Sequence, residues 1–71
     1  MTVRGLFLHF NRETSVIMYE NEEQKKRNID TWNGKVDDLI DGSRNTYAYC
    51  KVKDWYVNQS GVLEITLKEW L

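Results

Sequence analysis

Hydrophobic and polar residues alternate along the last third of the chain, where two β-rich runs flank the polar residues 58–61. A period of two, interrupted by a polar loop that ends in glycine, is typical of a β-hairpin. With Val57 opposite Val62, one face of this hairpin has the composition of a core: Ala48, Cys50, Val52, Tyr56, Leu63, Ile65, Leu67 and Leu71. The other face carries Glu64 and Thr66 among rings and lysines: Tyr47, Tyr49, Lys51, Lys53, Trp55, Lys68 and Trp70. The pattern predicts a hairpin over residues 46–71 with one buried face and one aromatic, charged face.

Residues 2–10 and 15–19 are the next candidate strands. Apolar side chains stand on both faces of the first run, TVRGLFLHF, which is typical of a strand that is covered on both sides. The second run, SVIMY, is short and rich in residues that favour β-structure. A polar turn separates them, so we expect a second hairpin in which Leu8 lies opposite Ile17 and Leu6 opposite Tyr19.

From Asn21 onward the period of the pattern changes to that of a helix. Asn21 and Gln24 have the spacing of a capping box. Apolar residues then recur at helical spacing, namely Ile29, Trp32, Val36, Leu39 and Ile40. The pattern predicts one helix over about residues 22–41, ending before Gly42.

Gly34 and a cluster of aspartates argue against an uninterrupted helix. Glycine inside a helix costs about 1 kcal/mol relative to alanine, and Asp37, Asp38 and Asp41 crowd the end where the helix dipole disfavours anions. A break at residues 33–34 followed by a second short helix would place Asp37 and Asp38 near a favourable amino-terminus. Asn-Gly is also a hairpin-turn signal, so a strand over residues 28–32 is a further alternative.

The predicted element order is ββαββ, and the predicted fold class is α+β. Two hairpins form a four-stranded antiparallel sheet, and the helix packs on one of its faces. With an additional strand, the order becomes that of a small five-stranded OB-like barrel, which is the alternative fold. At 71 residues, the chain is expected to form a single domain over residues 1–71.

Charge and cysteine content narrow the possible environments. The net charge of −1 gives no general electrostatic reason to bind nucleic acid or an anionic membrane. A single cysteine, Cys50, cannot form an internal disulfide, which favours a reducing compartment. Neither a signal peptide nor an apolar run of about 20 residues is present. We therefore expect a cytoplasmic protein with no membrane partner.

The residue types needed for catalysis are scarce. His9 and Cys50 are the only histidine and cysteine, which is too few for a structural zinc site. The aspartates near residue 40 lack the spacing of a calcium loop, and the four glycines form no phosphate-binding loop. We expect no enzyme, no cofactor and no metal.

The aromatic, charged face of the hairpin is the leading candidate binding site. Tyrosine and tryptophan are favoured anchors of protein interfaces, so we expect association with another protein, of the inhibitor or adaptor type, or with a second copy of the chain. Rings interleaved with lysines also suit single-stranded nucleic acid, which is the alternative ligand. A third hypothesis is an acidic helix face that mimics DNA, made by Asp30, Asp37 and Asp41. A face covered by the rest of the protein would have a similar aromatic composition.

Overall fold

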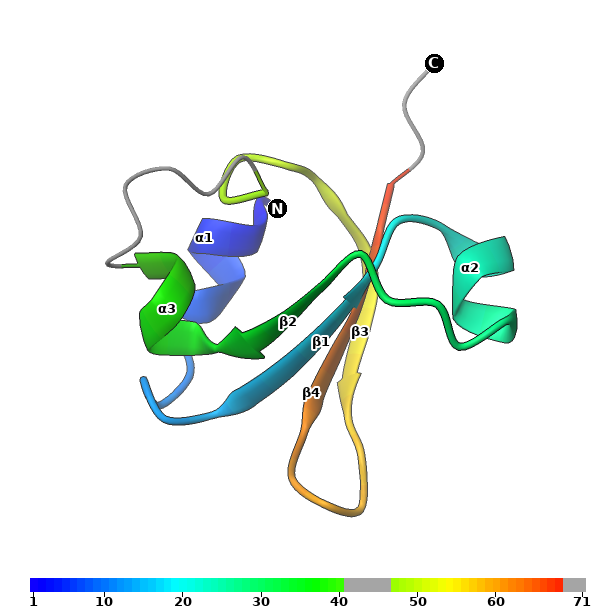
Figure 1. Ribbon diagram of the computed structural model, residues 1–71. Helices are drawn as coiled ribbons and strands as arrows, with labels where there is room; N and C mark the ends of the chain where they lie inside the picture. Colours follow the sequence, from blue (N-terminus) through cyan, green and yellow to red (C-terminus); the bar gives the residue numbers. More distant parts are fainter. Residues whose placement is uncertain (41–46, 69–71) are drawn as a thin grey trace.

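The computed structural model describes residues 1–40 and 47–68. In chain order, the described residues form α1 (Val3–Phe7), β1 (Ser15–Tyr19), α2 (Glu22–Lys26), β2 (Trp32–Lys35), α3 (Val36–Ile40), β3 (Val52–Val57) and β4 (Leu63–Leu67) (Figure 1). The predicted α+β class and its four-stranded sheet are confirmed. Asp41, Trp70 and Leu71, which the sequence placed in the helix and the hairpin, lie outside the described residues.

The sheet is open and mixed, with the strand order β2-β1-β4-β3. β1 pairs antiparallel with β2, and β3 pairs antiparallel with β4. The two central strands, β1 and β4, run parallel, with Val16 beside Leu63 and Met18 beside Ile65. The expectation of a fully antiparallel sheet is therefore wrong, and the alternative of a closed barrel is wrong as well. β2 takes the antiparallel place beside β1 that the predicted first strand was expected to occupy, and β4 lies on the other side of β1.

Residues 3–7 form a helix, so the prediction of a strand over residues 2–10 is wrong. Thr2 is the N-cap of α1, and its Oγ1 accepts a hydrogen bond from the Gly5 N–H at 3.1 Å. Val3, Leu6 and Phe7 are buried together, at spacings of three and four residues that a helix places on one face. The two faces expected for a strand are therefore replaced by one helical face, while Leu8 is 66% exposed and Phe10 lies beyond the helix. The expected hairpin between residues 2–10 and β1 is consequently absent.

The predicted helix over residues 22–41 is interrupted by a strand. Asn21 caps α2 as expected, since its Oδ1 accepts from the Gln24 N–H at 2.9 Å. Asn28, at φ 56°, has the left-handed conformation that commonly follows a helix end. The alternative of a break near Gly34 with a second short helix is confirmed, because α3 begins at Val36 with two aspartates in its first turn. The alternative of a strand over residues 28–32 that ends at an Asn-Gly turn is wrong, because the strand found here, β2, spans Trp32–Lys35 and contains residues 33–34.

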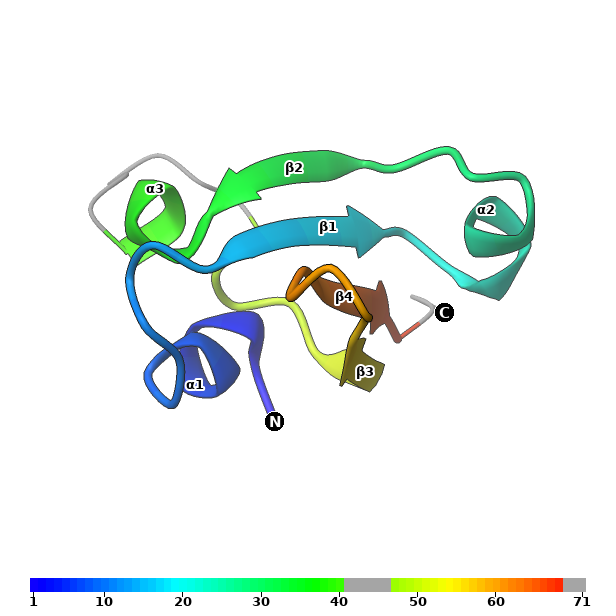
Figure 2. The same cartoon turned by 90° about the horizontal axis from the view of Figure 1, so that it is seen from below.

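The core lies between one face of the sheet and the helices α1 and α3, which lie near each other (Figure 2). The sheet contributes Val16, Met18, Leu63, Ile65 and Leu67. The helices contribute Val3, Leu6, Phe7, Val36 and Leu39. α2 lies at the far end of the sheet from α3, near the end of β1, and buries none of its residues (Figure 2).

The carboxy-terminal hairpin is present, but its register differs by one residue from the predicted one. Val57 lies opposite Leu63, and a bulge separates Val52 from Asp54. The Asn58 N–H donates to the Val62 carbonyl at 2.9 Å, which leaves a three-residue loop with Gly61 at φ 79°. A shift of one residue exchanges the faces of a strand. Trp55 is therefore opposite Ile65 and Tyr56 opposite Glu64, the reverse of the predicted face assignment.

Candidate functional site

β3 is an edge strand that exposes three consecutive large side chains. Trp55, Tyr56 and Val57 are 41, 43 and 47% exposed. Trp55 and Val57 lie on the face of the sheet that packs against α1, while Tyr56 lies on the opposite face. Phe10 meets Trp55 edge-on, with ring centroids 5.5 Å apart and planes at 87°. We call the side chains of Phe10, Trp55, Tyr56 and Val57, with the outer edge of β3, the β3 surface.

A polar cluster supports Tyr56 from the adjacent strand. The Glu64 carboxylate accepts hydrogen bonds from the Tyr56 hydroxyl at 2.8 Å and from Asn58 Nδ2 at 3.0 Å. The Tyr19 hydroxyl donates to its other oxygen at 3.4 Å. On the ring side, Lys25 Nζ lies 4.9 Å from the centroid of Tyr56. These contacts fix the orientation of Tyr56 on the face of the sheet.

The electrostatics of this cluster favour an ionised Glu64. Burial opposes ionisation, but the hydrogen bonds from Asn58, Tyr56 and Tyr19 and the charge of Lys25 outweigh it and lower the pKa of Glu64. The hydrogen bond to Glu64, together with burial, raises the pKa of Tyr56. Burial and the Glu64 charge raise the pKa of Tyr19. The carboxylate is charged and the phenols are protonated near neutral pH, so the cluster acts as a fixed support.

The predicted hairpin residues do not form one continuous face. Tyr47 is partly buried against the core, and its hydroxyl lies 2.9 Å from Thr31 Oγ1. Tyr49 is 74% exposed, and Lys53 Nζ lies 3.8 Å from a Glu22 carboxylate oxygen. Lys51 and Lys68 are exposed, and Trp70 lies outside the described residues. Of the predicted set, Trp55 alone belongs to the β3 surface.

Sequence reasoning missed Phe10, Tyr56 and Val57 as surface residues. Phe10 was assigned to a strand, and Tyr56 was assigned to the buried face because Val57 was paired with Val62. The length of the hairpin loop and the position of its glycine could have identified Tyr56 and Val57. A three-residue loop with glycine at its last position is a common hairpin connection, and it pairs residue 57 with residue 63.

The predicted acidic face depended on a continuous helix, which does not exist. Asp30 precedes β2 and accepts from Asn33 Nδ2 at 2.7 Å. Asp37 lies in α3 and pairs with Arg12 at 3.0 Å, while Asp41 lies outside the described residues. Asp30 and Asp37 thus stand on either side of a strand, and no helix aligns them.

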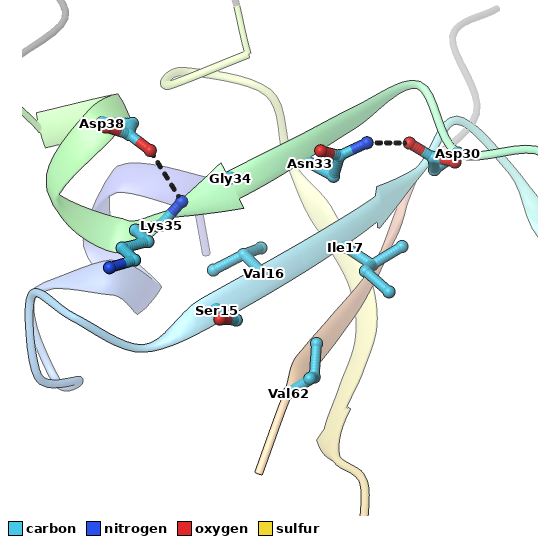
Figure 3. Close-up of a pocket in the computed structure, with 9 residues that line it drawn as sticks. All are labelled: Ser15, Val16, Ile17, Asp30, Asn33, Gly34, Lys35, Asp38 and Val62. Atoms are coloured by element: carbon cyan, nitrogen blue, oxygen red, sulfur yellow. Dashed lines mark hydrogen bonds between the residues drawn. The ribbon is translucent and has the colours of Figure 1, made fainter. Parts of the chain in front are cut away.

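A shallow groove crosses β1 and β2 (Figure 3). It is lined by Ser15, Val16, Ile17, Asp30, Asn33, Gly34, Lys35, Asp38 and Val62. Its two carboxylates already have partners within the chain, since Asp30 bonds Asn33 and Asp38 accepts from the Lys35 N–H at 2.9 Å. The groove therefore presents two carboxylates that are already hydrogen-bonded, beside the apolar residues Ile17 and Val62.

Within residues 1–40 and 47–68, no group of three or more histidine, cysteine, aspartate or glutamate residues could hold a metal ion. Cys50 is buried, and burial raises the pKa of its thiol, so the reactive thiolate form is disfavoured. None of the described helices is long and apolar enough to cross a membrane.

No family model, curated protein or solved structure matches the chain. The case for a function therefore depends on the geometry of the chain itself.

Proposed function

We propose that the protein is a small non-enzymatic binding module of the inhibitor or adaptor type, which associates with another protein through the β3 surface. One observation carries the proposal: three consecutive large side chains on an edge strand, Trp55, Tyr56 and Val57, are each more than two-fifths exposed. Large exposed side chains that cluster in this way mark interaction sites more often than ordinary solvent surface.

The support beneath these side chains strengthens the proposal. Trp55 is held by Phe10, and Tyr56 is held by Glu64 and lies beside Lys25. Anchors that are already ordered lose little conformational entropy when a partner binds, so more of the contact energy appears as affinity. Tryptophan and tyrosine are also the residues most often found at the energetic centre of interfaces.

Single-stranded nucleic acid is the second candidate ligand, because Lys51, Lys53 and Lys68 are exposed around the same hairpin. The geometry favours it less than a protein. Trp55 and Tyr56 face opposite sides of the sheet, so they offer bases no continuous surface on which to stack.

Titration with mixed-sequence single-stranded oligonucleotides, monitored by tryptophan fluorescence, distinguishes nucleic-acid binding from protein binding. Quenching that high salt reverses would favour nucleic acid.

The test of the protein-binding proposal is selection of peptides from a random library against the wild-type chain. Val57→Lys places a charge within the β3 surface, at a side chain that is 47% exposed. Ile29→Lys is the matched control, since Ile29 is 52% exposed and stands outside β3. We expect selected peptides to lose about tenfold or more in affinity for Val57→Lys, equivalent to about 1.4 kcal/mol, and to bind Ile29→Lys as they bind the wild type.

Circular dichroism and thermal unfolding establish that both variants are folded. Peptides that bind Val57→Lys as tightly as the wild type would place the site elsewhere. Failure to select any peptide, together with no self-association of the chain, would contradict the proposal altogether.

A further inference from the structure

Among the described residues, no strand pairs with the outer edge of β3 over a short regular stretch. The amino-terminal segment covers its beginning, where Thr2 bridges Lys51 and the Val52 N–H donates to the Met1 carbonyl at 2.9 Å. The bulge between Val52 and Asp54 then interrupts the ladder, and the loop starts at residue 59. Residues 54–58 remain as a regular edge, and Tyr56 is at its centre.

Trp55 and Val57 direct their backbone groups to this open side. Backbone bonds in an antiparallel ladder alternate between the two sides of a strand. The Asn58 N–H donates to the Val62 carbonyl, so residues 56 and 58 face β4 and residues 55 and 57 face away. The Trp55 N–H accordingly donates to no strand of the sheet but to Oδ1 of Asp54, the preceding residue of the same chain, at 2.8 Å.

We propose that a second copy of the chain pairs antiparallel with this edge, with Tyr56 opposite Tyr56 of the second copy and Asp54 as the acceptor that must be displaced. This proposal rests on the function proposed above and names its partner. Pairing would form four backbone hydrogen bonds between residues 55 and 57 of the two copies. Two of them use the N–H that Asp54 occupies in the single chain.

The sequence of the edge is complementary to itself in this register. Trp55 lies beside Val57 of the second copy on one face, and aromatic pairs with β-branched residues are favourable across strands. Asp54 lies opposite Asn58, so no like charges oppose each other. The apolar side chains of both copies, extended by Phe10, would then cover one another on the face beside α1.

The other sheet edge does not offer an equivalent site. β2 has four residues and continues directly into α3 at Val36, whose first turn holds the Lys35 N–H through Asp38 (Figure 3), so its regular edge is shorter than that of β3. β3 and β2 lie at opposite ends of the sheet (Figure 2). Pairing of β3 with β3 about a twofold axis closes on itself, so it predicts a dimer and not a growing filament.

Asp54 gives the proposal a specific signature. Asp54→Ala removes the competing acceptor, so we expect the dissociation constant of the dimer to fall about tenfold. Asp54→Asn is the matched control, because its side-chain oxygen can still accept from the Trp55 N–H while the charge is lost. Because a neutral amide oxygen is a weaker acceptor than a carboxylate, we expect Asp54→Asn to associate more tightly than the wild type and less tightly than Asp54→Ala. Sedimentation velocity over a wide concentration range measures each constant.

A backbone variant separates strand pairing from contact between side chains. Cys50 allows native chemical ligation of residues 1–49 to a synthetic segment of residues 50–71, in which Val57 can be N-methylated. N-methylation removes one outward N–H and leaves the side chain unchanged. We expect the methylated chain to fold and to remain monomeric where the unmethylated semisynthetic chain dimerises.

The outcomes separate the two proposals. A dimer that Asp54→Ala strengthens and N-methylation at Val57 abolishes supports strand pairing. A dimer that is lost in Val57→Lys, yet indifferent to both Asp54→Ala and N-methylation, would overturn strand pairing and leave the β3 surface as the association site. A chain that stays monomeric even as Asp54→Ala would overturn the second copy as partner, and selected peptides would then decide the proposed function alone.

Discussion

At the scale of single residues, Glu64 connects the exposed surface to the stability of the sheet. Its carboxylate accepts from Tyr19 at the end of β1 and from Tyr56 and Asn58 at the end of β3, two segments far apart in the sequence. Hydrogen bonds to a charged group are worth more than neutral ones, and unsatisfied partners are costly when partly buried. Glu64 therefore stabilises the fold and also holds an aromatic anchor of the β3 surface.

Glu64→Gln should reveal this role through its pH dependence. The folded state lowers the pKa of Glu64, so the stabilising contribution is complete above the unfolded-state pKa and is lost as pH falls through the folded-state pKa. We expect the variant to be less stable by about 1–3 kcal/mol at neutral pH, with a difference that shrinks toward acidic pH. Urea unfolding at several pH values measures it. A difference that stays constant with pH would contradict the role of the ionised carboxylate.

At the scale of elements, β2 is an edge strand formed by residues that the sequence pattern assigned to a helix. Trp32 and Gly34 lie on one face, and the Trp32 ring lies over Gly34 and packs near Phe7, with centroids 6.4 Å apart. A Cβ at Gly34 would stand 3.1 Å from the Trp32 ring and 3.1 Å from Asp38 Oδ2. A methyl group at residue 34 would therefore require the Trp32 ring or the Asp38 side chain to shift by a few tenths of an ångström.

Gly34→Ala distinguishes the strand from the helix by the sign of its effect. In a helix, alanine would stabilise by about 1 kcal/mol. In β2, we expect destabilisation by about 1–3 kcal/mol, because the new methyl group overpacks the tryptophan ring. In a Trp32→Ala background, the penalty should shrink, and a double-mutant cycle of unfolding free energies measures that coupling. A stabilised single variant would be incompatible with the strand.

Some elements of the fold could be predicted from the sequence and others could not. β1, the hairpin, the α2 cap at Asn21 and the break near Gly34 could be predicted, because each has a local signal in periodicity, capping or turn chemistry. The prediction of a strand over residues 2–10 was wrong because, over so short a run, Leu6 and Phe7 fit the period of a helix as well as that of a strand. The exposed edge could not be predicted, since the neighbours of β3 depend on the parallel pairing of β1 with β4, which are far apart in sequence.

At the scale of the whole molecule, that parallel pair joins the two halves of the chain. Residues 16–19 pair with residues 63–66, so the central strands form only when both halves are in place. Val16, Met18, Leu63 and Ile65 are fully or almost fully buried, whereas α2 buries no residue. A chain of this size has a total stability of roughly 4–10 kcal/mol. We therefore expect the central strands to resist local unfolding more strongly than α2 does.

Two helices of equal length make this distribution measurable. α1 and α2 have five residues each, but α1 buries Val3, Leu6 and Phe7. The Leu6 N–H in α1 and the Lys25 N–H in α2 make the same kind of bond, to the Thr2 carbonyl at 3.0 Å and the Asn21 carbonyl at 3.1 Å. Since burial, and not bond geometry, separates them, native-state hydrogen exchange should show the Lys25 amide opening locally and the Leu6 amide only with the central strands. We expect protection at least about a hundredfold lower at Lys25. Equal protection would mean that α2 belongs to the same cooperative unit as the core, despite having no buried side chain.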